Sequence, residues 1–475
     1  SMQHLAYHHG YLSLRAFVLQ FVAAALAIAS GHSVGREGPH IFLGAASGSL
    51  LGQRLSLPNN AIRTLVACGT AAGISASFNT PLAGVIFALE VVMMEYSLAS
   101  FVPVILAAVS ADAVSILVLG AEPAFSVPRL QMGSLAEMSL VLLLGVLVGA
   151  VAAGFIQLLE SLGAGSRDIP FWQRTTLAGL LVGCCGLLVP EVLGIGYDTV
   201  DQTLLGTPGI LMLLGLALFK VLATGFSIGL GIPGGLIGPS LFIGSVVGCL
   251  AGKLVLQLWP GIGSDVGFYA LLGMGAMMGA SLQAPLAALT AMMELTHNPQ
   301  IIMPGMLAIV VAGLTSRELF GKDSVFVSVL KARGLQVEAS PALQALRRVG
   351  VASVMETRLS RQPQRIGREQ AKALLQGQPE WILIEGGGQP LALLRALDLA
   401  LALEQEAATE LDLMEIPGRR LQLAPVQLQA TLQEALQQLD RSGAEALYVE
   451  RMTAPGIKPI FGILTREQVE SAYRP

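Results

Sequence analysis

Charged side chains are scarce in this sequence. Asp, Glu, Lys and Arg make up 13% of its 475 residues, about half the roughly 25% that soluble domains carry. Four tracts contain none of these residues: 64–89, 139–159, 221–252 and 266–293. Since about 20 residues of helix cross a hydrocarbon core of about 30 Å, tracts of this kind exclude a soluble protein over the first two thirds of the chain.

The same tracts lack the apolar and polar alternation of barrel strands, and they are far too long for such strands. Inside a bilayer every backbone polar group needs a partner within the protein, which leaves the α-helix as the spanning element. The mean hydropathy of +0.67 agrees. We therefore expect an all-α polytopic membrane protein with lipid as its surroundings.

An excess of positive charge is also missing, because 28 basic residues face 32 acidic ones. No nucleic-acid partner is expected from this balance. The four cysteines, Cys68, Cys184, Cys185 and Cys249, all lie in apolar tracts, so we expect buried apolar side chains and neither disulfides nor a metal site. Without a catalytic constellation in the apolar part, we expect no enzyme and no resident cofactor.

Composition changes near residue 331, where Gln, Glu and Arg become frequent. We assign residues 1–333 to a membrane domain and residues 341–475 to a second domain. Several of the expected membrane helices are too short to span, and Gly or Pro marks their ends, as in helices broken within the membrane. The expected helices are 15–33, 39–53, 61–74, 80–95, 99–119, 135–163, 175–190, 194–205, 210–228, 237–257, 266–280, 285–296, 300–318 and one from 323.

The membrane part repeats itself. A shift of 200 positions brings the segment 35–48 onto 235–248, with Gly, Pro and Phe matched in order. A shift of 204 matches 69–90 to 273–294 in the same way. Two similar halves with interrupted helices are typical of transporters whose substrate site lies between the halves. Glu90 and Glu294 occupy equivalent positions in this repeat, and we predict that they cap or pair structural elements.

The repeated segments have the form of anion sites. An anion in hydrocarbon needs fixed donors in place of water. The first turn of a helix offers unpaired N–H groups and about half a positive charge, and glycine lets the backbone approach the ion. Gly35-Arg36-Glu37-Gly38-Pro39 precedes one apolar helix, and the segment 231–239, which contains Gly235 and Gly238, precedes the other.

Glu37 is the residue of this segment that most needs an explanation, because an ionisable group at a buried helix start is costly. A charged Glu37 would occupy the anion's own place, and a protonated or displaced Glu37 would leave the path open. The structural alternative is a capping carboxylate at the membrane surface. Arg36 has two interpretations, attraction of anions at the mouth or anchoring among lipid headgroups.

The runs G-R-E-G-P at 35–39, G-I-P-G-G at 231–235 and F-N-T-P-L-A-G at 78–84 together resemble the CLC chloride channel and transporter family. The resemblance covers residues 3 to about 333. It implies a homodimer with one pore in each subunit, and it makes Glu37 the gate and outer proton acceptor. It also places the chloride-binding amides at Leu236 and Ile237. With chloride as the bound ion, the candidate anion site comprises Arg36, Glu37, Gly38, Gly235, Leu236, Ile237 and Phe326.

Three departures from the family pattern matter. The inner proton-accepting glutamate of coupled members falls on Val91, with Glu95 one helical turn away as a substitute or as a solvated helix end. The pore tyrosine of the family matches Phe326, which has no hydroxyl to offer chloride. The family's first serine motif, G-S-G-I-P, and the helices before it would lie upstream of residue 1.

The C-terminal domain resembles a pair of cystathionine-β-synthase (CBS) motifs, small α/β modules that are cytoplasmic in the family. A helix over 431–442, strands over 446–450 and 459–464, and a helix opened by Thr465 are expected in the second copy. In the family an Asp three residues after a Thr grips the ribose of an adenine nucleotide. The equivalent pairs here are Thr465 with Gln468, and Arg395 with Asp398. This mismatch favours a structural or dimerising module over nucleotide binding.

These observations predict a multi-pass protein of the cell membrane, and of the bacterial inner membrane in particular, that transports chloride or a similar small anion. Val91 favours a channel or a proton-uncoupled transporter. A chloride/proton antiporter is the alternative within the family. The alternative of another class is a nucleotide-sensing membrane receptor without transport.

Overall fold

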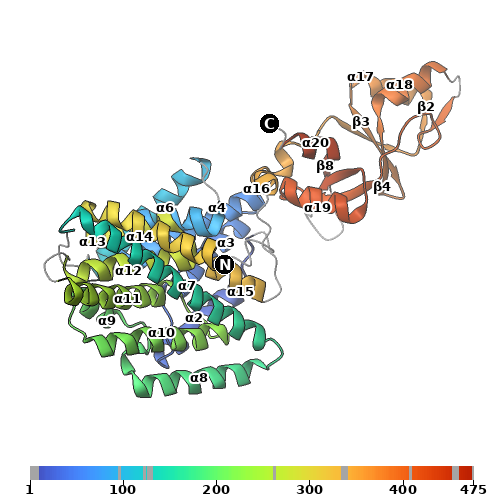
Figure 1. Cartoon of the computed structure of the whole chain (residues 1–475). Coiled ribbons are helices and arrows are strands. Elements are labelled where there is room, and N and C mark those ends of the chain that lie inside the picture. Colours follow the sequence, from blue (N-terminus) through green and yellow to red (C-terminus); the bar gives the residue numbers. More distant parts are fainter. Residues whose placement is uncertain are drawn as a thin grey trace. The chain divides into compact units, whose positions relative to one another are not determined.

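The computed structural model divides the chain into two units, which are described separately (Figure 1). One unit comprises residues 1–55 and 62–337, and the other comprises 56–61 and 338–475. The structure describes residues 10–94, 98–120, 125, 132–259, 264–332, 341–405, 409–451 and 459–472.

The secondary-structure elements described in the first unit are all helices, as predicted. Six of its described helical segments are long and apolar enough to cross a membrane. Large apolar side chains such as Leu117, Leu187 and Leu211 are more than four-fifths exposed on the outside of the bundle, which is the pattern of a lipid-facing surface. The helices are α2 (Leu14–Ala29), α3 (Glu37–Arg54), α4 (Asn59–Phe78), α5 (Pro81–Phe87), η1 (Ala88–Met93), α6 (Leu98–Leu119), η2 (Leu135–Glu137), α7 (Met138–Gly165), α8 (Phe171–Leu188), η3 (Pro190–Val192), α9 (Tyr197–Leu204), α10 (Ile210–Gly229), α11 (Ile237–Leu258), α12 (Val266–Leu282), α13 (Pro285–Thr296), η4 (Pro299–Ile301), α14 (Ile302–Leu314), η5 (Thr315–Leu319) and α15 (Val325–Ala332).

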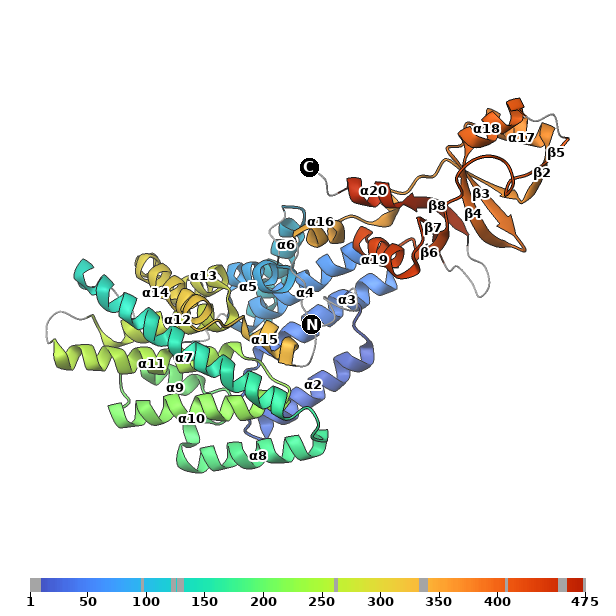
Figure 2. The ribbon, with the colours of Figure 1, turned by 45° about the vertical axis from the view of Figure 1, so that its right-hand side comes forward.

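Helix α12 forms the centre of this unit. Every residue from Gly267 to Leu282 is buried, and α12 packs against α7, α11, α13 and α14. The two ribbon views show α11, α12 and α7 side by side (Figures 1 and 2). A helix that is apolar on all sides belongs in the core of such a bundle.

The sequence repeat is also a repeat of backbone geometry. Asn79, directly after α4, has φ of 55°, and Gln283, directly after α12, has φ of 51°. These left-handed residues stop the helices, and Pro81 and Pro285 begin the next ones, where a first-turn proline needs no N–H partner. Each half therefore breaks its helix at the same point.

Glycines let the paired helices of each half approach closely. A Cβ on Gly44 would lie 2.0 Å from the Gly69 carbonyl oxygen, and a Cβ on Gly244 would lie 2.3 Å from that of Gly273. No side chain fits at such distances. The crossing of α3 with α4 is thus reproduced by the crossing of α11 with α12.

Glu90 and Glu294 tie the two halves together by crossed caps. The Glu294 carboxylate accepts from the amides of Leu82 and Ala83 at 2.9 and 2.7 Å. The Glu90 carboxylate accepts from those of Leu286 and Ala287 at 3.2 and 2.8 Å. The predicted capping role is confirmed, but each glutamate caps a helix of the other half.

The second unit is an α/β module made of two similar parts. Each part has a three-stranded sheet, β1-β3-β4 or β6-β7-β8, in which the first pair is parallel and the second antiparallel. A two-stranded sheet pairs β2 with β5. The elements are α16 (Pro341–Arg348), η6 (Val351–Ser353), β1 (Leu359–Pro363), β2 (Arg365–Gly367), α17 (Arg368–Gln376), β3 (Trp381–Gly386), β4 (Gln389–Arg395), α18 (Ala396–Gln405), β5 (Glu410–Asp412), β6 (Leu423–Gln427), α19 (Leu432–Ser442), β7 (Ala446–Glu450), β8 (Ile460–Thr465) and α20 (Arg466–Ser471).

The two parts of this module share an apolar core. Trp381, Leu383 and Leu393 from the first part pack with Ala446 and Ile463 from the second. The helix and strands expected in the second part are α19, β7 and β8, so the predicted secondary structure is confirmed there. Helix α20 is capped by Thr465, as predicted.

Candidate functional site

The two glycine-rich segments that the repeat relates lie against each other. The Gly35 amide donates to the Gly235 carbonyl at 2.9 Å, and the Gly235 amide donates to the Gly35 carbonyl at 2.8 Å. This two-bond backbone bridge lies directly before α3 and α11. It therefore brings the N-terminal turns of the two helices together.

Glycine is required on both sides of the bridge. A Cβ on Gly38 would lie 2.7 Å from the Gly235 Cα atom, and a Cβ on Gly235 would lie 2.6 Å from the Gly38 backbone nitrogen. Contacts this short leave no room for any side chain. The backbone itself therefore forms the wall of the site at these positions.

The Glu37 carboxylate is buried between the two helix starts. Its side chain is fully inaccessible, and its oxygens lie over Gly35, Gly235 and Gly238. Oε1 accepts a hydrogen bond from the Tyr197 hydroxyl, whereas Oε2 has no hydrogen-bond partner among the described residues. A negative group is thus placed where the positive end of α11 would hold an anion.

Leu236 is the N-cap residue of α11 and Ile237 is its first residue. Their amides lie outside the hydrogen bonds within the helix. Amides of a first turn have no intrahelical acceptor. Among the described residues, the structure records no carbonyl partner for either amide. These two N–H groups are therefore available as donors.

A cavity of about 420 Å³ opens in front of these amides. It brings together five residues of the predicted anion site, Gly38, Gly235, Leu236, Ile237 and Phe326, and it also includes Val91. The other lining residues are Gln20, Ile41, Phe42, Phe87, Val92, Ile228, Gly231, Pro233, Gly234, Val329 and Leu330. The lining side chains of the described residues are uncharged, so the backbone N–H groups of Leu236 and Ile237 are candidate anion donors.

Val91 and Phe326 form part of the apolar wall. Val91 is on η1 and is 5% exposed. Phe326 is on α15, and its ring meets that of Phe87 edge to face at 6.4 Å between centroids. The expected substitute Glu95 lies outside the described residues.

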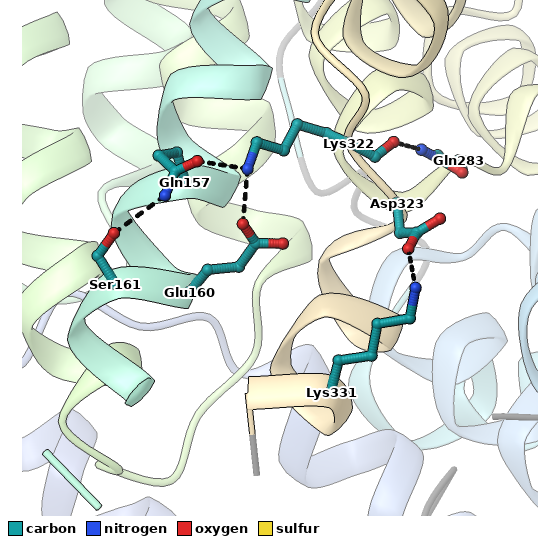
Figure 3. A network of polar contacts seen from close by, with 7 residues as sticks. All are labelled: Gln157, Glu160, Ser161, Gln283, Lys322, Asp323 and Lys331. Carbon is teal, nitrogen blue, oxygen red and sulfur yellow. Dashed lines mark hydrogen bonds and ion pairs between the residues drawn. The ribbon is translucent and has the colours of Figure 1, made fainter. Parts of the chain in front are cut away.

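A polar network holds the start of the helix that carries Phe326 (Figure 3). Lys322 Nζ donates to Glu160 on α7 at 2.6 Å and also to Gln157. Gln283, the residue directly after α12, donates to the Lys322 carbonyl at 2.5 Å. Asp323 pairs with Lys331 along α15. The N-terminus of α15 is therefore fixed to α7 and α12.

Arg36 is at the back of the site and does not line the cavity. Its Nη2 donates to the Ser77 carbonyl at 3.2 Å, and its guanidinium lies 5.2 Å from the centre of the Tyr197 ring. A cation over an aromatic face at this range is attractive. The described contacts of Arg36 are thus with the Ser77 carbonyl and the Tyr197 ring.

Two residues of the site were not predicted from the sequence. Tyr197, in a short polar helix, carries no sequence signal that links it to Glu37. Lys220 is fully buried in the apolar helix α10, and its Nζ donates to the Val192 and Gly194 carbonyls at 3.0 Å each. A lone charge in a helix of this kind is itself a signal of function, so Lys220 could have been found.

The two candidate nucleotide residues of the C-terminal module are not brought together. Thr465 lines a cleft of about 530 Å³ with Trp381 and Arg395, whereas Asp398 is not among its lining residues. Thr465 and Gln468 use their side chains in a reciprocal capping box at the start of α20. Gln468 is therefore engaged by its own helix.

Two of the three arginines that line this cleft are paired with acids. Arg466 binds Asp440 at 2.9 Å, and Arg419 pairs with Glu445. The Arg419 guanidinium lowers the pKa of the Glu445 carboxyl below its ordinary value through a hydrogen bond. The third arginine, Arg395, lies over the Trp381 ring at 5.4 Å, so only part of the positive charge in the cleft is neutralised by acids of the module.

A helical membrane bundle with two opposed helix N-termini, a buried carboxylate between them and an uncharged cavity in front is an anion-handling membrane protein. The sequence model of the family described as voltage gated chloride channel matches residues 1–317. The chain therefore belongs to the voltage-gated chloride channel, or CLC, family, as the sequence motifs predicted.

Two curated relatives match the sequence of this chain over most of their own length. A putative ClcB-like chloride channel protein of Ralstonia nicotianae is 35% identical over 336 residues, which are 69% of this chain and 78% of that protein. A voltage-gated ClC-type chloride channel, ClcB, of Escherichia coli is 34% identical over 322 residues, which are 67% of this chain and 76% of that protein.

Solved structures share the fold. A slow cyanobacterial Cl⁻/H⁺ antiporter is 25% identical with a TM-score of 0.60, over 66% of this chain and 75% of that one. A CLC-type fluoride/proton antiporter is 23% identical with a TM-score of 0.58, and the match covers 69% of this chain and 81% of that one. A eukaryotic CLC transporter is 19% identical with a TM-score of 0.59, and the match covers 98% of this chain and 82% of that one. The last two show the fold alone.

Proposed function

We propose that this protein passes chloride through the cavity and past Glu37, which acts as the gate. The burial of the Glu37 carboxylate over Gly235 and Gly238, at the N-terminal turn of α11, carries this proposal. A carboxylate and a chloride ion cannot share one set of donors. Anion passage therefore requires Glu37 to be protonated or displaced.

The proposed transport is not strictly coupled to protons. Val91 occupies the position of the inner proton acceptor and lines the cavity, and a valine side chain binds no proton. Both reported curated relatives are named as chloride channels. Phe326 also presents no hydroxyl to the cavity, which leaves fewer donors for an ion at its centre.

A chloride/proton antiporter is the second candidate. The observation in its favour is that a solved structure with this fold, 25% identical to this chain, is a Cl⁻/H⁺ antiporter. Such an activity would need a proton path that bypasses Val91. The named relatives and the apolar wall around Val91 support the uncoupled reading.

Anion and proton movements measured together in sealed proteoliposomes separate these candidates. We expect a chloride gradient to drive anion flux without proton uptake, and we expect Glu37→Gln to raise flux and remove its pH dependence. Val91→Glu should introduce proton uptake. Proton uptake by the unaltered protein would favour the antiporter, and unchanged, pH-dependent flux in Glu37→Gln would remove Glu37 as the gate.

We further propose a homodimeric, multi-pass protein of the bacterial inner membrane, with the C-terminal module in the cytoplasm. Membership of the CLC family and the apolar helices support this assignment. We propose that the module is of the CBS type and serves assembly, because Gln468 and two of the cleft arginines, Arg419 and Arg466, are engaged within the module. A nucleotide-sensing receptor would show nucleotide binding and no flux.

A further inference from the structure

Tyr197 is the first residue of α9, and it contacts the proposed gate directly. Its hydroxyl donates a hydrogen bond to Oε1 of Glu37, 160 residues away in the sequence. Within the described part of the chain, Oε2 of the same carboxylate has no partner. The phenol is therefore the side-chain donor that fixes the position of this carboxylate.

The loop before Tyr197 is fixed by Lys220 and by the packing of Gly196 against Phe242. Lys220 Nζ donates to the carbonyls of Val192 and Gly194 at 3.0 Å. Gly196 adopts φ of +80°, and a Cβ there would lie 2.7 Å from the Phe242 ring. The chain therefore enters α9 in one defined direction, which aims Tyr197 at Glu37.

The Tyr197 ring is enclosed on its remaining sides. Its centroid is 4.8 Å from that of Phe125 and 6.4 Å from that of Phe78. The Arg36 guanidinium lies over the ring at 5.2 Å. Aromatic and cation contacts of this kind restrict the ring, so the hydroxyl is a fixed donor.

The charges around Glu37 come from several elements. Arg36 directly precedes α3, and Lys220 on α10 is close enough to interact electrostatically with Glu37. His40, one turn along α3, binds Ser77 through Nδ1 at 2.5 Å. Helix α11 faces Glu37 with backbone at Gly238. Tyr197→Phe leaves the two carbonyl partners of Lys220 unchanged and keeps the aromatic ring under the Arg36 guanidinium.

We propose that Tyr197 is a latch for the gate, a positioning residue whose hydroxyl holds the charged Glu37 carboxylate in its blocking position. This inference rests on the proposed gating role of Glu37. A hydrogen bond to a carboxylate is roughly twice as strong as one to a neutral acid. Protonation of Glu37 therefore weakens the latch at the moment when the gate must open.

Tyr197→Phe removes the hydroxyl and keeps the ring between Phe125 and Phe78. The charged, blocking form of Glu37 loses one stabilising donor, so Glu37 accepts a proton at higher pH and leaves more readily. We expect anion flux at neutral pH to rise about tenfold, and the pH of half-maximal flux to rise by about one unit. The assay is chloride efflux from proteoliposomes of the full chain between pH 4 and pH 9.

Tyr269→Phe is the matched control, because the Tyr269 hydroxyl also donates to a buried carboxylate, that of Glu137, at 2.9 Å. Neither Tyr269 nor Glu137 lines the cavity, so we expect Tyr269→Phe to leave the pH dependence of chloride flux unshifted. Thermal stability and gel-filtration profiles of the two variants show whether a change in flux reflects misfolding. Tyr197→Phe should be no less stable than Tyr269→Phe.

The double variant Glu37→Gln/Tyr197→Phe distinguishes the latch from the gate. We expect it to match Glu37→Gln, with flux that is high and independent of pH. An equal effect of Tyr197→Phe in both backgrounds, or a profile of Tyr197→Phe identical to that of the unaltered protein, would overturn the latch while the gate stands. A Glu37→Gln variant that keeps the original pH dependence would instead overturn the gate itself.

Discussion

Glu294→Gln removes a charge that caps a helix of the opposite half. The Glu294 carboxylate accepts from the amides of Leu82 and Ala83 at 2.9 and 2.7 Å, in the first turn of α5. A glutamine keeps one oxygen as an acceptor and loses the other, together with the attraction between the charge and the helix dipole. The expected loss of unfolding free energy is about 1–2 kcal/mol, from one charge-assisted hydrogen bond and the dipole.

The comparison with Glu90→Gln makes this expectation specific. Glu90 caps α13 by the same geometry, so its loss of stability should be similar. The helix that Glu294 caps continues into η1 and lines the cavity at Phe87, Val91 and Val92, whereas α13 contributes no lining residue there. We therefore expect Glu294→Gln to reduce chloride flux more than Glu90→Gln does.

The assay is thermal unfolding in detergent micelles, followed by chloride efflux from proteoliposomes. Glu191→Gln is the control, because Glu191 is an exposed glutamate in η3. A Glu294→Gln variant as stable as Glu191→Gln would refute the assigned strength of the crossed caps. Equal flux in Glu294→Gln and Glu90→Gln, at equal loss of stability, would refute the link between this cap and the cavity wall.

Three further expectations concern the polar network and the C-terminal module. Lys322→Met should raise amide hydrogen exchange in α15, because the 2.6 Å ion pair to Glu160 is lost; unchanged exchange would show that the helix is held by packing alone. Calorimetric titration of the full chain with ATP should show no binding below about 1 mM, because Thr465 and Gln468 cap α20; a tighter Kd would contradict this. The Met414 amide and the Gln364 side chain lower the pKa of Asp412 below its ordinary 3.8, so its contribution to stability is present above about pH 4 and is lost at lower pH. The protection of the β2 and β5 amides from exchange, relative to the unfolded chain at the same pH, should therefore fall between pH 4 and pH 2, and Asp412→Asn should weaken this dependence.

Most of the helical framework was predictable from the sequence because uncharged tracts and helix breakers determine it locally. The helix expected over 285–296 is α13 to the residue, and 210–228 differs from α10 by one residue. The helix expected over 15–33 ends instead at Ala29, because Ser30 and Gly31 turn the chain toward the G-R-E-G-P segment. Patterns of composition cannot resolve such a terminal turn.

The contacts between distant segments were not predictable in the same way. Equivalent positions showed that Glu90 and Glu294 play equal roles, but two glutamates that cap their own halves would have the same sequence pattern. Tyr197 reaches Glu37 because Lys220 and Gly196 set the direction of a loop, which is a property of tertiary packing. A single sequence contains no information on which of its tyrosines meets a given acid.

The pairing of Gly35 with Gly235 has a consequence for biosynthesis. During translation Gly35 is synthesised 200 residues before Gly235. The N-terminus of α3 therefore lacks its bridge to the N-terminus of α11 until those residues have been made. Contacts between such distant positions form slowly and late. The proposed ion-binding site is thus formed only in the final assembly, because it needs residues from both halves of the chain.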